Sequence, residues 1–251
     1  MINFDEDIFK YSSYDVGKLI ISSQSLNFNN PRSFNDPFDC DINLLKFDYT
    51  DVSEEINAEI QLLKANLKKK REPSFIEGIN ALTDSKFEEF YKKAQINKVN
   101  NSSICCFSKT HNDTTMWSHY AASHTGVCLI FDPYVKDPFI SRRMVGNGPA
   151  NYSNNHDVVN YLQSKIKGIE NIFFSKSKEW EYESEYRYIS FEEYGLFKFD
   201  PNFLKGVIFG QRTNESQIIR MKELCEESGF NNLSFGKMIK KKLELEFERI
   251  T

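Results

Sequence analysis

The chain has 251 residues and a formal net charge of −4, with 40% hydrophobic and 27% charged residues. This balance is typical of a folded globular protein and excludes wholesale disorder and fibrous repeats. No stretch reaches the roughly 20 apolar residues that span a bilayer, and the acidic start lacks the basic and apolar regions of a secretory signal. We therefore expect a cytoplasmic protein that does not bind membranes, and one with no global basic field for nucleic acid.

The cysteines and histidines indicate neither a disulfide framework nor a metal site. The cysteine count is odd and the spacing is irregular, which favours reduced and mostly buried thiols. Cys105 and Cys106 are adjacent, and the four histidines lack metal-binding spacing, so no metal is expected.

The first hundred residues predict short strands followed by a helical insertion. Strands are expected over 9–11 and 26–28, on either side of a helix over 14–22. Residues 29–40 contain Pro31 and Pro37 and form a structured loop. Apolar residues at helical spacing predict helices over 53–70, ended by Pro73, and over 84–96. We assign residues 45–100 as a helical insertion within a single domain of residues 1–251.

The rest of the chain continues in short strands with connecting helices. Strands are predicted over 104–108, 127–131, 185–190, 207–209, 233–235 and 243–250. Helices are predicted from a cap at Asn112 or Asp113 to Ser123, over 155–174 and over 214–227, and residues 138–149 are expected to be loop. Without strict strand–helix alternation, the pattern favours an α+β fold with mixed or antiparallel sheets of short strands.

The segment 180–188 is the densest in candidate functional groups. In an extended chain, Glu181, Glu183 and Glu185 would share one face with Arg187. Carboxylates at short distance raise one another's pKa and a nearby arginine lowers it, so such a cluster indicates a site. The alternative is an edge strand with an exposed charged face.

A second candidate segment is Met116-Trp117-Ser118-His119-Tyr120. On a helix, Trp117 and Tyr120 share a face, whereas His119 points elsewhere. His119 could carry a proton in catalysis, or it could be an ordinary capping or core histidine.

A third candidate is the turn over 33–39. Asn35 and Asp36 precede Pro37 and form the turn through side-chain to backbone hydrogen bonds. Phe34 and Phe38 are expected to anchor it in the core. The turn is either purely structural, or it holds Asn35 and Asp36 rigidly toward a ligand.

Taken together, these segments resemble the bacterial family called domain of unknown function 2971. The resemblance covers nearly the whole chain outside the insertion, and the family name implies no reaction. It rests on the motifs Phe9-Lys10-Tyr11, Phe34-Asn35-Asp36-Pro37-Phe38-Asp39, Cys106-Phe107-Ser108, Met116-Trp117-Ser118-His119-Tyr120, His124-x-Gly126-Val127-Cys128 with Phe131-Asp132, Lys178-x-Trp180-x-Tyr182-Glu183-x-Glu185-x-Arg187, and Gly206-Val207-Ile208-Phe209-Gly210.

The order of elements is also similar to the ADP-ribosyltransferase fold, in which NAD lies in a cleft between two small sheets. That resemblance implies that Glu185 is the catalytic glutamate, with Glu183 as its accessory. It places Lys10 and Tyr11 where the fold usually carries Arg or His, and Ser108 at a polar position of a middle strand. A carboxylate opposite a developing cation gains strength in a dry cleft.

Three functions are therefore carried forward. The first is an NAD-consuming transferase or glycohydrolase, acting as a bacterial toxin or anti-phage effector on a protein or nucleic acid target. The second is a nuclease that uses the acidic cluster, with Lys176 and Lys178 nearby and His119 as general base. The third is a non-enzymatic sensor that binds a nucleotide or protein segment. Its aromatic and cationic pocket would comprise Trp117, Tyr120, Trp180 and Arg187.

Overall fold

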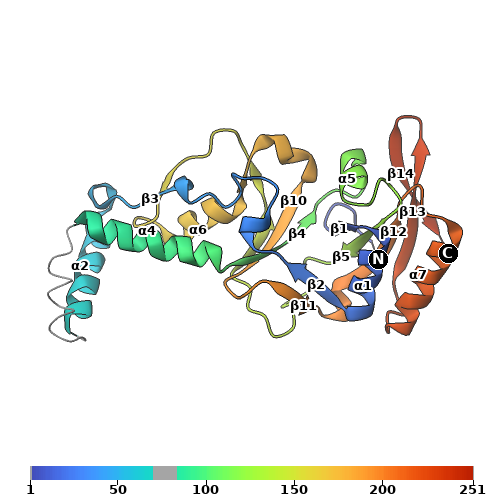
Figure 1. Cartoon of the computed structure of the whole chain (residues 1–251), viewed down its shortest axis with the longest axis horizontal. Coiled ribbons are helices and arrows are strands. Elements are labelled where there is room, and N and C mark those ends of the chain that lie inside the picture. The colour runs from blue at the N-terminus through green and yellow to red at the C-terminus, as the bar shows by residue number, and fades with distance from the viewer. Residues whose placement is uncertain (1, 70–83, 251) are drawn as a thin grey trace.

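The central sheet of the protein has eight strands: β1 (Ile8–Ser12), β4 (Ser103–Ser108), β5 (Val127–Phe131), β6 (Gly146–Pro149), β10 (Glu185–Ser190), β12 (Leu204–Phe209), β13 (Ser234–Lys241) and β14 (Glu244–Ile250). Their order is β14-β13-β12-β5-β1-β4-β10-β6 (Figure 1). Only β12 and β13 are parallel within this sheet. The computed structural model describes residues 2–69 and 84–250. It confirms the α+β prediction with a mixed, mostly antiparallel sheet.

The middle of this sheet contains a seam that positions the candidate site. β1 pairs with β5 along its whole length, and β4 pairs along its whole length with β10. Between β1 and β4, however, the register has one pair, Phe9 with Ser108. The sheet therefore divides into β14-β13-β12-β5-β1 on one side and β4-β10-β6 on the other.

Six α-helices and three pairs of short strands accompany the central sheet in the described ranges. The helices are α1 (Tyr14–Ser23), α2 (Glu54–Lys69), α4 (Asp84–Asn100), α5 (Thr114–His119), α6 (Lys165–Phe174) and α7 (Glu215–Glu227). The paired strands are β2 (Ser25–Phe28) with β11 (Gly195–Lys198), β3 (Leu45–Lys46) with β8 (Val159–Asn160), and β7 (Asn151–Tyr152) with β9 (Ser175–Lys176). None of the helices in the described ranges is long and apolar enough to cross a membrane.

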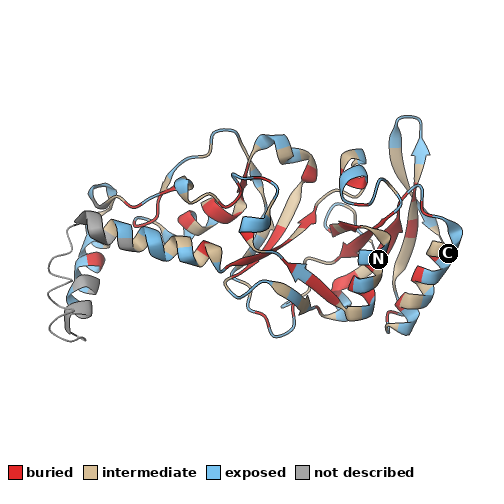
Figure 2. Cartoon of the chain, in the orientation of Figure 1, coloured by how far each residue is buried: buried red, intermediate tan, exposed pale blue. Residues whose placement is uncertain are grey.

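The core follows from the continuous apolar runs of the inner strands. All five residues of β5 are buried, as expected of a strand covered on both faces (Figure 2). α1 and α7 pack against each other beside this strand. In the predicted insertion, Ile60 of α2 and Val99 of α4 join a separate apolar cluster with Tyr161 and Phe173. α2 lies at one end of the molecule, and α4 runs from there toward the start of β4 (Figure 1).

Most predicted elements are confirmed, with ends that differ by a few residues. Capping explains several boundaries. Ser13 caps α1, Asp113 caps α5, and Asn214 caps α7 with a full capping box. All five cysteines are free, as predicted. The predicted end of the first insertion helix, at Lys70 and Pro73, lies outside the described residues.

Two predictions between residues 138 and 174 are wrong. The predicted helix over 155–174 begins only at Lys165, because Ser164 caps it. Before it, Val159 and Asn160 form β8, where the Asn160 amide donates to the carbonyls of Asp48 and Asp51. The predicted loop over 138–149 contains β6, which pairs with β10. In both places long-range pairing overrides local periodicity.

Three shorter corrections concern the candidate segments. The helix predicted to reach Ser123 ends at His119, and the backbone at Ala122 has a positive φ of 48°. Residues 178–183 form a 3₁₀ helix, called η4, instead of an extended strand. Phe38, expected in the core, is 66% exposed, whereas Phe34 packs partly against the insertion cluster.

Candidate functional site

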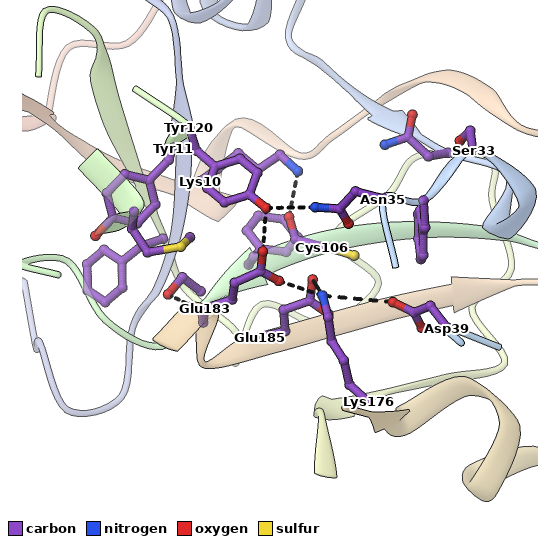
Figure 3. Close-up of a pocket in the computed structure, with 16 residues that line it drawn as sticks. Lys10, Tyr11, Ser33, Asn35, Asp39, Cys106, Tyr120, Lys176, Glu183 and Glu185 are labelled. Carbon is purple, nitrogen blue, oxygen red and sulfur yellow. Dashed lines mark hydrogen bonds and ion pairs between the residues drawn. The ribbon is translucent and has the colours of Figure 1, made fainter. Parts of the chain in front are cut away.

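A cavity of about 380 Å³ opens at the seam between β1 and β4 (Figure 3). Side chains from both halves of the sheet form its walls, together with the turn over 33–39, α5 and the segment from β9 to β10. The lining residues are Phe9, Lys10, Tyr11, Asn29, Ser33, Phe34, Asn35, Asp39, Cys106, Phe107, Ser108, Met116, Tyr120, Lys176, Glu183 and Glu185. Its volume lies in the range of small-molecule sites.

Two glutamates meet one lysine at the floor of this cavity. Glu183 ends η4, Ser184 turns the chain with a φ of 43°, and Glu185 begins β10. Lys176, the last residue of β9, places its Nζ 2.5 Å from Glu183 Oε2 and 3.0 Å from Glu185 Oε1. The αL turn thus directs both carboxylates to one ammonium group, although they do not lie on one strand.

A buried arginine holds Glu185 from below. Arg187 donates from both terminal nitrogens to Asp39 at 2.7 Å, and its Nε donates to Glu185 Oε2 at 2.5 Å. The side chains of Arg187 and Asp39 are 0% and 1% exposed. Buried bidentate pairs of this kind fix geometry as well as charge. Asp39 therefore ties the turn over 33–39 to the strand that carries Glu185.

The floor carries one surplus negative charge when all its groups are ionised. Three carboxylates, Asp39, Glu183 and Glu185, are paired there with two cations, Lys176 in the floor and Arg187 directly beneath it. A cationic group that enters the cavity would therefore be attracted to this floor.

The surroundings shift the pKa values of the two glutamates in opposite directions. Burial opposes ionisation of Glu185, but the charges of Arg187 and Lys176 outweigh burial and lower its pKa to about 2. Burial raises the pKa of Glu183, and the nearby Lys176 and the Tyr120 hydroxyl only partly offset this effect. Such a pair of carboxylates is typical of sites that need both a permanent anion and a proton-transfer group.

Hydrogen-bond donors line the opposite wall. Lys10 Nζ donates to the carbonyl of Cys106 at 2.5 Å across the seam, and no carboxylate in the described ranges pairs with it. Asn29, Ser33 and Asn35 lie on the same cavity and are exposed. The cavity is therefore bipolar, with a donor-rich wall facing an anionic floor.

The structure brings most of the predicted site residues together. Lys10, Tyr11, Asn35, Ser108, Tyr120, Glu183 and Glu185 all line the cavity. Tyr120 donates its hydroxyl to Glu183 and accepts from the Asn35 amide at 3.3 Å. Ser108 donates to the backbone carbonyl of Glu183 at 2.7 Å, so it supports the site from beneath.

Four predicted site residues lie outside the cavity lining. His119 is exposed, with its ring beside those of Tyr120 and Tyr182. Trp117 is fully buried against Tyr11 and belongs to the core. Asp36 is buried and accepts from the Phe38 backbone within the turn, and Arg187 lies below the floor.

Asp39 and Lys176 are the site residues that the sequence did not reveal. Lys176 entered only the nuclease alternative, and Asp39 appeared only as the end of a turn motif. Asp39 reaches its partner Arg187 across 148 positions of the chain, so no local spacing could show the pair. The one available signal was the unusual density of charge beside the predicted strand over 185–190.

Comparison with known proteins finds a family model that matches part of this α+β chain. Residues 116–188 match the model of the family described as protein of unknown function (DUF2971). This match supports the resemblance to that family that the motifs predicted. The matched region runs from α5 to β10 and contains Tyr120, Lys176, Glu183, Glu185 and Arg187. No curated protein and no solved structure matches the chain.

Proposed function

We propose that the protein cleaves the bond between nicotinamide and ribose in NAD, as an ADP-ribosyltransferase or NAD glycohydrolase. The observation that carries this proposal is the pair of glutamates on an anionic cavity floor, with their pKa values shifted in opposite directions. The predicted resemblance to the ADP-ribosyltransferase fold points to the same two residues.

The reaction uses the two glutamates in different roles. The C1′–N bond breaks, nicotinamide leaves as a neutral molecule with the bonding electrons, and C1′ gains oxocarbenium character. Glu185 stays ionised and stabilises this developing cation. Glu183 accepts a proton from the attacking water or acceptor group, because a base of raised pKa is better suited to proton transfer near neutral pH.

The donor-rich wall supports binding of the rest of the substrate. The Lys10 ammonium lacks a carboxylate partner among the described residues, so it is available to the diphosphate. Asn35 and Ser33 add hydrogen-bond donors at the mouth of the same cavity. The pyridinium end and the phosphates of NAD thus match the two electrostatic sides of the cavity.

A second candidate is a module that binds a nucleotide without turning it over. It is favoured by the double pairing of Glu185, whose two oxygens already accept from Lys176 and Arg187. A carboxylate held in this way could serve only to shape the cavity. The nuclease alternative combined the acidic cluster and its cations with His119 as general base, and His119 lies outside the cavity that the glutamates line.

The biological setting of this proposal is that of a cytoplasmic bacterial effector, either a toxin or an anti-phage protein. Its target would be a protein or a nucleic acid. Both statements rest on the proposed NAD chemistry and on the family resemblance, and they fail if that chemistry is absent.

The test is release of nicotinamide from NAD, measured by chromatography with and without cell extract as a source of acceptor. We expect Glu185→Gln to lose activity by roughly 100-fold or more, as for removal of other transition-state electrostatic partners. Glu181→Gln is the matched control, because Glu181 is an exposed glutamate of η4 outside the cavity. Circular dichroism checks that both variants fold. Equal turnover by Glu185→Gln and the wild type, or none by the wild type, refutes the proposal.

Binding without turnover would support the second candidate. A rise in the thermal unfolding midpoint with NAD, in the absence of any nicotinamide release, identifies a binding module. Intact labelled RNA and DNA after incubation with Mg²⁺ would exclude the nuclease alternative.

A further inference from the structure

Four aromatic side chains form a continuous group that starts at Tyr120 on the cavity wall. Tyr120 and His119 come from the end of α5, and Tyr182 and Trp180 come from η4, which packs against it. The ring centroids of neighbours lie 6.4 Å apart for His119–Tyr120 and 6.2 Å apart for both His119–Tyr182 and Trp180–Tyr182. We call this group the aromatic ledge.

The ledge is available to a ligand and its geometry is fixed. His119 is exposed, Tyr120 is 36% exposed, and Trp180 and Tyr182 are half-buried. His119 packs edge-on against both tyrosine rings, an arrangement that holds aromatic groups in place. Partly exposed aromatic rings held in this way match the stacking platforms that bind nucleobases.

The ledge is continuous with the cavity at both of its ends. The Tyr120 hydroxyl reaches Glu183 on the cavity floor (Figure 3). At the other end, Lys176 Nζ lies 5.3 Å from the centroid of the Trp180 ring. The cation that neutralises the floor thus also supports the indole from the cavity side. A ligand that fills the cavity would pass directly onto the ledge.

The charges around the ledge decide which ligand fits it. Glu179 and Glu181 are exposed in η4, with Lys178 as the one cation of that segment. This surrounding disfavours a strand of nucleic acid, whose phosphates would meet carboxylates at every step. A single uncharged base suits the ledge, and a dinucleotide in the cavity carries such a base at its far end.

We propose that the aromatic ledge stacks the adenine base of the dinucleotide whose nicotinamide end lies in the cavity. This inference rests on the proposed NAD chemistry for its choice of ligand. It assigns His119 and Trp180, which do not line the cavity, to substrate binding. The same contacts would make the enzyme select a dinucleotide over nicotinamide mononucleotide.

The experiment compares two ligands, each of which carries only one end of NAD. AMP carries the adenine end, nicotinamide mononucleotide carries the other, and binding of each is measured by calorimetry. We expect His119→Ala to weaken AMP binding roughly 10-fold, within the range for loss of one stacking partner, and to leave the mononucleotide unaffected. Trp180→Ala should act in the same direction, and Trp180→Phe should retain most of the affinity because a phenyl ring still stacks. Tyr134→Ala removes an aromatic ring that is 74% exposed and outside the ledge, so it serves as control.

Turnover gives an independent readout. With NAD, His119→Ala should raise KM about 10-fold at unchanged kcat, because the lost contact is remote from the reacting bond. AMP affinity that is equal in the wild type and in both alanine variants overturns the ledge, even if nicotinamide is released. Tighter binding of an oligonucleotide than of AMP also overturns it. AMP binding that depends on the ledge, without any nicotinamide release, upholds the ledge and rejects the NAD chemistry.

Discussion

Removal of the Glu185 charge tests the electrostatic structure of the cavity floor without any assumption about substrate. In unfolded chains the pKa of glutamate is about 4.3, and in the folded protein that of Glu185 is about 2. The lowered pKa corresponds to about 3 kcal/mol of folding free energy at neutral pH. Loss of one member of a buried ion pair costs a similar amount. Glu185→Gln should therefore destabilise the protein by about 3 kcal/mol at pH 7.

The sign of the pH dependence follows from the direction of the pKa change. Because the folded-state pKa is lowered, the stabilisation is present above the unfolded pKa and is lost as the pH falls toward 2. The free-energy difference between the wild type and Glu185→Gln should decrease to about half of its neutral value near pH 3.

Urea denaturation monitored by circular dichroism provides the measurement. At pH 7 the midpoint of Glu185→Gln should fall by roughly 1 to 1.5 M, given the usual denaturant sensitivity. The exposed Glu181→Gln should change it by less than about 0.5 kcal/mol in free energy. Equal midpoints for wild type and Glu185→Gln, or a difference that grows on acidification, would refute the reasoning.

Three further predictions concern neighbouring groups. Tyr120→Phe removes a hydroxyl that donates to ionised Glu183, so the pKa of Glu183 should rise further. The acid limb of the pH profile of nicotinamide release should then move to higher pH. An unmoved limb would show that Tyr120 does not influence the group that transfers the proton. Asp39→Asn breaks a fully buried bidentate pair with Arg187 and should cost about 3–5 kcal/mol in urea denaturation, whereas a loss below about 1 kcal/mol would contradict that pairing. Gly126→Ala would place a methyl group 2.2 Å from a backbone carbonyl oxygen, so the thermal midpoint should fall in line with a loss of about 1–3 kcal/mol, and an unchanged midpoint would argue against this close packing.

Most strands of the central sheet and most helices could be predicted because their signals are local. The apolar run over 127–131 is buried on every residue, and the capping residues Asp113 and Asn214 mark helix starts that the structure confirms. The helix predicted over 155–174 failed because its first half pairs with a distant strand, and local periodicity carries no information about that partner.

The candidate site divides in the same way. Glu183 and Glu185 could be singled out from the sequence, since several clustered carboxylates raise one another's pKa and such clustering is typical of a site. The predicted reason for their convergence was wrong, because η4 and the αL residue Ser184 turn Glu183 toward Lys176 instead of a shared strand face.

The sequence by itself determined most of the central strands, most of the helices and the acidic segment, because each depends on neighbours within a few residues. Only the tertiary structure decided that β1 and β4 part at a seam, and that Asp39 meets Arg187 there. The tertiary structure also decided that His119 lies beside Tyr182 and outside the cavity lining. These contacts join segments that lie far apart along the chain. Their energies come from burial and from charge pairing between distant segments. Such interactions leave no pattern among neighbouring residues from which they could be predicted.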